Sequence, residues 1–483
     1  MKRNKINLHI SQNDDGLYFW DRIDPSKLEM CMTILAAILI SLPVIVSLTV
    51  RLWIYTMKGA DGARLCDSSV VNQYWHSLVY FTGALMGACI VFNAAKRYSF
   101  RSLSCLREKK WYLSHWLGLN LFFLLVWSVI SGFLAQDWNL SLWGDYYCHE
   151  GVLLFSFYAF FFLAGTWLQP GHRKFLLELL AVIASVMGVC SIVAVNYTPH
   201  ILFIKDMESA VFHNRNHYGY FGAVCAPLII GLTLQDRNTS KILKAGRYME
   251  MWLIFNGLMC SNTRGAFLAV EITLICWNIY IFLMRKDLKR KMIAIDVLFL
   301  LTAIFLNFGT LMFLRLETLW QDLIALFSGA GRKKPLDTLG TGRMRLWKYG
   351  MQFACEKPLF GYGPGNLEIP YSRTECQYFS PHNDLVLIVA SMGFPAVYFY
   401  LSGLTAHLRG FFRYVKGMTI LDVTMYAVVG SYLISSFVGT SMYYTTPYYF
   451  LFLGFSYSVY KHHYAEAQAD LLPKSEPESE ESI

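Results

Sequence analysis

Charged side chains are scarce in this 483-residue chain. Asp, Glu, Lys and Arg make up 16% of it and hydrophobic residues 55%, whereas typical soluble domains carry about 25% charge. With 14 Pro and 34 Gly, the chain lacks the composition of a collagen-like or disordered protein. Its 11 Cys fall mostly inside apolar runs, where a thiol behaves as a small hydrophobic group, which argues against a disulfide scaffold. The composition therefore predicts a polytopic membrane protein.

Apolar runs long enough to cross a bilayer recur along the chain. About 20 apolar residues form a helix that spans a hydrocarbon core roughly 30 Å thick. Helices are expected because lipid offers no partner to unpaired backbone groups, and the alternating pattern of an outer-membrane barrel is lacking. We therefore predict an all-α protein with about twelve transmembrane helices. The predicted segments are 30–53, 75–95, 111–134, 152–168, 175–196, 217–234, 249–262, 265–284, 292–313, 384–406, 419–440 and 448–460.

Lys and Arg are distributed unevenly between these segments. Every second loop, counted from the N-terminal segment, is basic, whereas residues 135–150 and 441–447 contain no Lys or Arg. Positive charge is retained on the cytosolic side of a membrane, so the pattern predicts an even number of spans and two cytosolic termini. A nucleic-acid-binding surface would instead gather its Lys and Arg on one folded face, so no nucleic-acid partner is expected.

The spans divide the chain into five parts. Residues 1–29 form a polar cytosolic segment, and the apolar run after them is too long for a signal peptide and lacks a small-residue cleavage site, so it is expected to be an uncleaved anchor. Residues 30–313 hold spans one to nine, and residues 384–460 hold spans ten to twelve. Between them lies a large outer loop, 314–383. The last part, 461–483, is predicted to be an acidic, disordered cytosolic tail.

The outer loop carries its own helical signals. Leu316, Leu319, Trp320 and Leu323 recur at helical spacing and predict a helix lying along the membrane interface. A second amphipathic helix is predicted around 346–355. Long structured loops often form binding sites or lids, although a simple tether between spans fits the same pattern.

Polar residues gather at the outer ends of the predicted spans. Arg presents a planar fork that matches phosphate oxygens, and the pKa of His lies near neutrality, so that it can take a proton from a hydroxyl group. These residue types suit sugar transfer from a lipid diphosphate, in which the acceptor hydroxyl attacks the anomeric carbon and the diphosphate leaves. The candidates are Asn214, Arg215, Asn216 and His217, then Arg264, then Arg343 and Arg345, and finally His382, Asn383 and Asp384.

Simpler roles are open for each of these residues. A single Arg near a membrane boundary often extends to lipid headgroups, and His382 suits the neighbourhood of a helix cap. His213 and His217 have the spacing of a zinc pair, but no third ligand accompanies them, so no metal is expected. The glycines from Gly361 to Gly365 follow no predicted strand and form no nucleotide fingerprint, but they permit tight turns near a possible ligand.

Four motifs follow one another along the chain. They are Asn214-Arg215-Asn216 with Tyr218-Gly219, Thr263-Arg264-Gly265-Ala266, the run from Arg343 and Trp347 to Gly363, and Pro381-His382-Asn383 followed by Ser391-Met392-Gly393-Phe394. In this order they resemble the O-antigen ligase/polymerase superfamily of bacterial membrane glycosyltransferases, and the resemblance covers roughly residues 205–410. Two departures stand out: Thr263 replaces the usual Ser before Arg264, and Tyr147-Cys148-His149 replaces an Arg that often precedes Glu150-Gly151.

The resemblance implies metal-independent, inverting transfer of a glycan from undecaprenyl diphosphate, without a cofactor, at the outer face of the bacterial cytoplasmic membrane. The acceptor would be a hydroxyl group of a lipid, a wall polymer or a protein. By analogy, His382 is the general base or orients the acceptor. The diphosphate would be bound by Arg215, Arg264 and one or both of Arg343 and Arg345. The supporting residues would be Asn214, Asn216, His217, Asn383 and Asp384.

Other functions are left open by the sequence. A polymerase would join two lipid-linked units and would need a second basic outer groove, so the single concentrated set of Arg residues slightly favours a ligase. A transporter of lipid-linked sugar would need ionisable residues near the bilayer midplane, and Glu178, Glu271 and Asp296 form no series. A non-catalytic membrane scaffold is a further alternative. Cys66 and Cys148 lie in predicted outer loops and could form a disulfide if the outside is oxidising.

Overall fold

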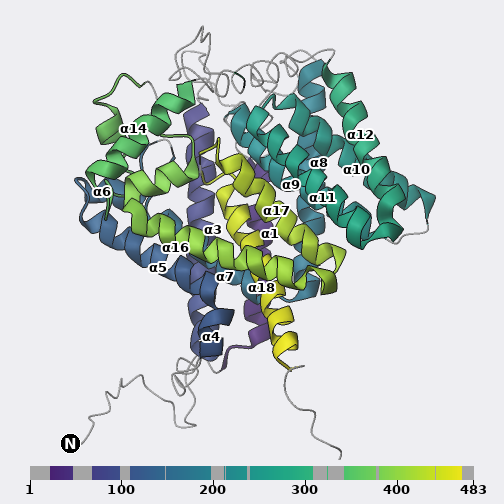
Figure 1. Ribbon diagram of the computed structural model, residues 1–483, viewed down its shortest axis with the longest axis horizontal. Helices are drawn as coiled ribbons and strands as arrows, with labels where there is room; N and C mark the ends of the chain where they lie inside the picture. The colour runs from purple at the N-terminus through teal and green to yellow at the C-terminus, as the bar shows by residue number, and fades with distance from the viewer. Residues whose placement is uncertain are drawn as a thin grey trace, which may run out of the picture.

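The computed structural model describes residues 22–46, 68–97, 109–146, 148–196, 212, 214–236, 240–307, 324, 342–376, 380–440 and 442–469. Within these ranges the regular structure is entirely helical, which confirms the predicted fold class (Figure 1). The helices are α1 (Pro25–Ile45), α3 (Ser68–Arg97), α4 (Lys109–Ser114), α5 (Trp116–Phe133), α6 (Trp138–Trp143), α7 (Val152–Trp167), α8 (Pro170–Asn196), α9 (Arg215–Gln235), α10 (Lys241–Cys260), α11 (Arg264–Met284), α12 (Lys289–Asn307), α14 (Arg343–Glu356), α15 (Glu368–Tyr371), α16 (Asp384–Tyr414), α17 (Ile420–Ser436) and α18 (Thr446–Ala469).

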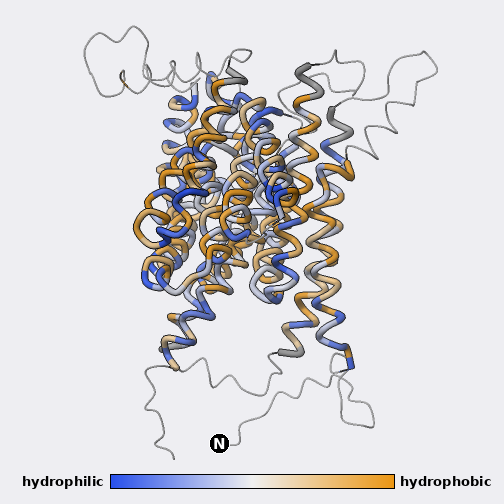
Figure 2. Tube along the Cα trace, turned by 90° about the vertical axis from the view of Figure 1, so that its right-hand side faces the viewer, coloured by the Kyte–Doolittle hydropathy of each residue, from blue (hydrophilic) through white to orange (hydrophobic). Residues whose placement is uncertain are grey.

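Each of the twelve predicted segments overlaps a described helix, although residues 47–53 and 308–313 lie outside the described residues and segment 111–134 is divided between α4 and α5. By length and composition, seven helices of the described part can cross a membrane, namely α1, α3, α5, α8, α9, α11 and α16, and the apolar α7 and α17 are shorter. Hydrophobic residues occur along the helices over most of the height of the bundle in Figure 2. That all twelve helices cross the membrane stays a prediction, because α10 and α12 begin with several charged residues.

Two predicted boundaries change. Helix α18 continues to Ala469, so residues 461–469 are helical where a disordered tail was predicted from residue 461. The second amphipathic helix of the outer loop is present as α14, three residues longer at its start than predicted. The predicted interface helix at 316–327 falls, apart from Ile324, outside the described residues.

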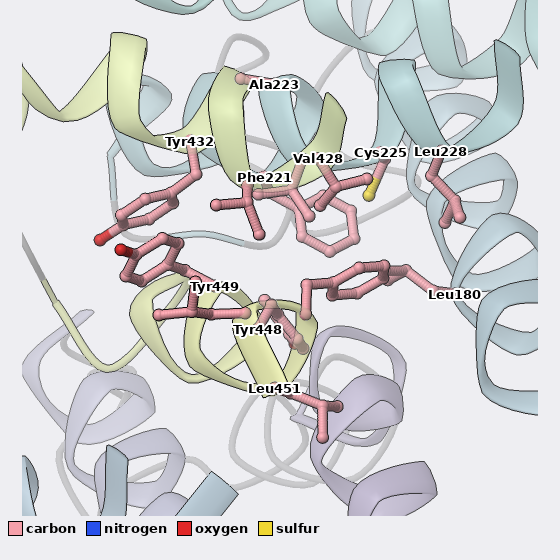
Figure 3. Close-up of a cluster of buried hydrophobic side chains, with 14 of the residues drawn as sticks. Leu180, Phe221, Ala223, Cys225, Leu228, Val428, Tyr432, Tyr448, Tyr449 and Leu451 are labelled. Carbon is pink, nitrogen blue, oxygen red and sulfur yellow. The ribbon is translucent and has the colours of Figure 1, made fainter. Parts of the chain in front are cut away.

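Helix α9 is the centre of one half of the bundle. All of its residues from His217 to Leu234 are buried, and α8, α10, α11 and α17 pack around it. Figure 3 shows Phe221 and Cys225 of α9 close to Val428 of α17, with Tyr448 of α18 beside them. Because lipid is as apolar as these side chains, close packing rather than exclusion of water holds such helices together.

The last three helices connect the two halves of the molecule. Helix α16 packs on α5, α17 on α9, and α18 on α7 (Figure 1). Gly165 of α7 lies so close to α18 that a Cβ atom at this position would overlap the Leu451 carbonyl oxygen. Small residues allow this kind of close backbone approach between membrane helices. In Figure 1, α1 begins and α18 ends at the same, lower side of the molecule, as an even number of crossings requires.

Helix α16 is interrupted at Gly393, where φ is 81° and ψ is 176°. The break leaves backbone carbonyls of the first half without helical partners. The N–H groups of Tyr362 and Gly363 donate to the carbonyls of Ala390 and Ser391, at 3.0 and 2.7 Å. The glycine-rich run, for which the sequence suggested a place near a ligand, therefore supports the broken helix that carries His382 at its start.

We expect Gly393→Ala to destabilise the protein by about 1–3 kcal/mol. A residue with a side chain is strained at this positive φ, and its Cβ atom would overlap the carbonyl oxygen of Leu359. Thermal unfolding of the purified protein in detergent measures the effect. Gly430→Ala is the matched control, since a Cβ atom at this position in α17 meets open space and Ala favours a helix. Equal melting temperatures for the two variants would contradict the prediction.

Candidate functional site

The N-terminal ends of α9 and α11 lie side by side. The Thr263 hydroxyl group donates to the Arg215 carbonyl at 3.0 Å, and a Cβ atom at Gly219 would overlap the Thr263 side chain. Arg215 and Arg264 are the first residues of these two helices. Because helix N-termini carry a partial positive charge, the two starts and their Arg side chains form a region that favours anions.

The connection between α17 and α18 crosses this region. The Tyr220 hydroxyl group of α9 donates to the Val438 carbonyl at 2.9 Å, and a Cβ atom at Gly265 would overlap the Val438 side chain. Two residues later, the Thr440 side chain reaches His382. The 437–445 segment therefore links the helix starts of Arg215 and Arg264 to that of His382.

His382 lies just before α16 in an unusual conformation. Its φ is 50°, which is uncommon for a residue other than glycine. Its Nδ1 atom lies 2.5 Å from the Thr440 hydroxyl oxygen. Burial, together with the positive charge of Arg343, lowers the pKa of His382 from 6.5 to about 4. The imidazole is therefore neutral at pH 7, the state in which a ring nitrogen can accept a proton.

Arg343 is the first residue of α14 and faces the same place. Its guanidinium group interacts with the Tyr220 hydroxyl group as well as with His382. Arg345 follows two residues later, and two residues turn a helix by about 200°. The two side chains therefore leave α14 in nearly opposite directions. Of the pair predicted from the sequence, only Arg343 is directed at His382.

Two of the predicted supporting residues are helix caps. The Asn214 side chain accepts from the Asn216 N–H group at 2.9 Å at the start of α9. The Asn383 side chain accepts from two N–H groups at the start of α16, those of Leu385 at 3.0 Å and Val386 at 3.1 Å. Such caps satisfy backbone donors that a helix start leaves unpaired. These caps fix where α9 begins, at Arg215, and where α16 begins, two residues after His382.

The family comparison applies to this region. Residues 250–401, from α10 into α16, match the Wzy_C family model, described as O-Antigen ligase. The match includes Arg264, Arg343, Arg345 and His382. This match supports a relationship of the chain to the O-antigen ligase/polymerase superfamily. This confirms the resemblance found in the sequence and indicates a glycosyltransferase-type membrane protein whose partners are, in general terms, a lipid-linked glycan and an acceptor. No curated protein matches the chain.

Two buried carboxyl groups lie in the interior of the protein. Asp384 is 4% exposed and Glu150 is 3% exposed. Glu150 accepts a hydrogen bond from the Tyr158 hydroxyl group at 2.8 Å. Burial, and then the nearby charge of Asp384, raise the pKa of Glu150 well above its usual range. Asp384 was predicted as a supporting residue, whereas Glu150 was noted only as part of a Glu-Gly pair.

Asp384 acts electrostatically on tyrosine hydroxyl groups. Its charge acts on Tyr400, Tyr432 and Tyr449, which come from α16, α17 and α18. The Tyr400 and Tyr449 hydroxyl oxygens lie 3.0 Å apart. The remaining supporting candidate, His217, is buried on α9 with its ring 5.0 Å from that of Tyr444. A polar, tyrosine-rich layer thus extends from the site into the bundle.

The carboxylates that a transporter would need are separate from this layer. Glu178 forms an ion pair with Arg247 at 2.7 Å between α8 and α10, and Asp296 accepts from Asn278 at 3.1 Å between α12 and α11. Arg247 also pairs with Glu250 at 2.8 Å, so in the described part of the chain these carboxylates make local contacts between neighbouring helices. Cys148 is buried, but Cys66 lies outside the described residues, so their disulfide stays a prediction.

Proposed function

We propose that the chain transfers a glycan from undecaprenyl diphosphate to a hydroxyl group of an acceptor at the outer face of the bacterial cytoplasmic membrane. The observation that carries this proposal is that His382, half-buried just before α16, lies close enough to Arg343 for the guanidinium charge to lower the pKa of its imidazole. The helix starts of Arg215 and Arg264 lie across the 437–445 segment from them. A base and an anion-binding group side by side are what this reaction requires.

In the proposed reaction, His382 receives the proton of the acceptor hydroxyl group. With its Nδ1–H group donating to Thr440, its Nε2 atom carries the lone pair that takes this proton. The acceptor oxygen then forms a bond to the anomeric carbon from the face opposite the diphosphate. The bond between that carbon and the phosphate oxygen breaks, and the configuration inverts. The electron pair remains on the diphosphate.

Charge develops on the diphosphate as it leaves, and the Arg residues are placed to stabilise it. A fixed donor aimed at a developing charge typically contributes about 3 kcal/mol in an enclosed site. Arg343 lowers the pKa of His382 when no anion is bound. A bound diphosphate would offset that positive charge and raise the pKa of His382 towards the value a general base needs near neutral pH. Donor binding would thus activate the base.

We expect Arg264→Lys to lower the transfer rate about tenfold or more while preserving the charge. The ammonium group of Lys is a point charge and cannot make two parallel hydrogen bonds to phosphate oxygens. Transfer kinetics with purified protein measure the effect. Arg285→Lys, at the other end of α11 and paired with Asp287 at 3.3 Å, is the matched control and should transfer normally. An unaffected Arg264→Lys variant would count against diphosphate binding at Arg264.

Reconstitution tests the proposal directly. The full-length protein in lipid nanodiscs is incubated with an undecaprenyl-diphosphate-linked glycan and with lipid or glycan acceptors, and products are separated by size. A single addition to the acceptor supports a ligase, and a ladder of lipid-linked products indicates a polymerase. In sealed vesicles, movement of the glycolipid across the bilayer without a new glycosidic bond would indicate a transporter and overturn the proposal.

A further inference from the structure

A second group of polar rings lies at the outer ends of α3 and α7. The His76 ring of α3 stacks on the His149 ring, with centroids 3.8 Å apart and planes 20° apart. The Tyr80 ring lies 4.1 Å from His76 and parallel to Trp143, at 6.3 Å and 16°. His76, Tyr80 and His149 are half-buried, and Trp143 is 51% exposed. We call these four residues the ring array. Trp143 is the most exposed of the four, and its ring is the aromatic surface that a ligand can reach.

The ring array is connected to the proposed catalytic residue by the 437–445 segment. Tyr443 packs against both imidazoles, at 5.4 Å from His76 and 5.8 Å from His149. Thr440, which contacts His382, is only three residues earlier. Three residues span at most about 11 Å, which is on the order of the length of one or two sugar rings. His382 and the array thus contact the same short stretch of chain, at Thr440 and at Tyr443.

Buried polar atoms at the array have no partner within the described part of the chain. These are the Nε2 atom of His76 and the Oε2 atom of Glu150. Tyr80 lies next to both residues, because its ring contacts the His76 ring and its hydroxyl group interacts electrostatically with Glu150. Buried polar groups in native proteins are nearly always hydrogen-bonded. Two such atoms beside the same tyrosine indicate that a ligand with hydroxyl groups completes the site.

We propose that the ring array, with Glu150, binds a pyranose ring of the glycan. A sugar ring offers an apolar C–H face, which suits the half-exposed Trp143 ring, and a rim of hydroxyl groups, which suits Glu150 and the His76 nitrogen. None of these side chains carries a fixed positive charge, so the array suits a neutral sugar, while the Arg residues serve the diphosphate. The inference rests on the proposed function, and the sugar belongs to either the donor or the acceptor.

Saturation-transfer NMR on the full-length protein in nanodiscs tests sugar binding without requiring turnover. The probes are N-acetylglucosamine, glucose, galactose and rhamnose. We expect transfer to the ring protons of at least one sugar for the wild type, and an at least fivefold weaker signal for Tyr80→Ala. Tyr398→Ala, on the surface of α16 and 63% exposed, is the matched control and should behave as the wild type. Equal signals for Tyr80→Ala and the wild type, or no transfer to any probe from the wild type, would overturn the inference.

If Tyr80→Ala fails to elute as a folded protein in size-exclusion chromatography, Trp143→Ala provides the same test, since Trp143 is half exposed and removal of its ring leaves the core intact. In the transfer assay, the KM for the substrate whose sugar occupies the array should rise about tenfold. A rise for the donor or for the acceptor identifies the source. An unchanged KM for both overturns the inference but leaves the transfer activity standing. Sugar binding without any transfer would instead reject the proposed function alone.

Discussion

Replacing His382 with Ala is expected to reduce glycan transfer about 10²–10⁴-fold, the range typical for loss of a general base. The reason is that the imidazole is held neutral and fixed at Nδ1 by Thr440, and alanine can neither accept a proton nor orient a hydroxyl group. Single-turnover transfer with purified protein measures the loss. Size-exclusion elution and the melting temperature show whether the variant is folded.

His462→Ala is a suitable control for this variant. His462 lies near the end of α18, its side chain is 69% exposed, and transfer should proceed at the wild-type rate. Donor binding by His382→Ala should stay within a few-fold of the wild type, because the Arg residues are untouched. Turnover of His382→Ala within tenfold of the wild type would remove His382 from the chemical step.

Replacing Arg343 with Gln is expected to have the second largest effect. Loss of one charged contact to the leaving diphosphate should lower kcat about 10²-fold, which corresponds to about 3 kcal/mol. Lys348→Gln, on the exposed part of the same helix, removes a positive charge of α14 away from His382 and should leave kcat nearly unchanged. A similar loss for both variants would point to a general effect of charge on α14 instead of a contact at the site.

The Arg343 variant also makes a prediction for pH dependence. Arg343 lowers the pKa of His382, so removing its charge should raise that pKa. The base is active only when neutral. For the wild type without bound donor, kcat/KM should therefore fall only as the pH approaches about 4, and for Arg343→Gln the fall should begin at higher pH. An acid limb at the same pH in both proteins would show that Arg343 does not act on the base.

Folding stability should follow the same titration. The unfolded chain has a His pKa near 6.5, and the folded protein holds His382 at about 4. Between these values the unfolded state binds more protons, so stability falls as the pH is lowered through this window and is fully present above it. The contribution should vanish in His382→Ala.

The broken helix connects this chemistry to the fold. The first half of α16 begins at Asp384 and ends at Gly393, and the glycine-rich run completes its backbone hydrogen bonds. Non-helical backbone is tolerated at membrane depth only where protein satisfies it. His382 is therefore held at the start of a short helical piece that has fixed neighbours on both sides.

The sequence by itself determined the features that depend on nearby residues. Apolar periodicity predicted α14 and the helices that the twelve predicted spans overlap. An α-helix repeats every 3.6 residues, so its apolar face can be recognised from residues that lie close together in the chain. The order of Arg and His motifs also gave the family resemblance that the match to residues 250–401 supports. Residue types alone were enough to name Arg264 and His382 as candidates.

Only the tertiary structure decided which of these residues meet. The Arg343 guanidinium group acts on Tyr220 of α9 as well as on His382, and Thr440, which follows α17, contacts His382 just before α16. Glu150 and Asp384 interact electrostatically, although more than two hundred residues separate them in the sequence. The glycine-rich run at 361–365 supports the broken helix α16. Contacts over such separations follow from the packing of whole helices, which a local pattern of residues does not contain.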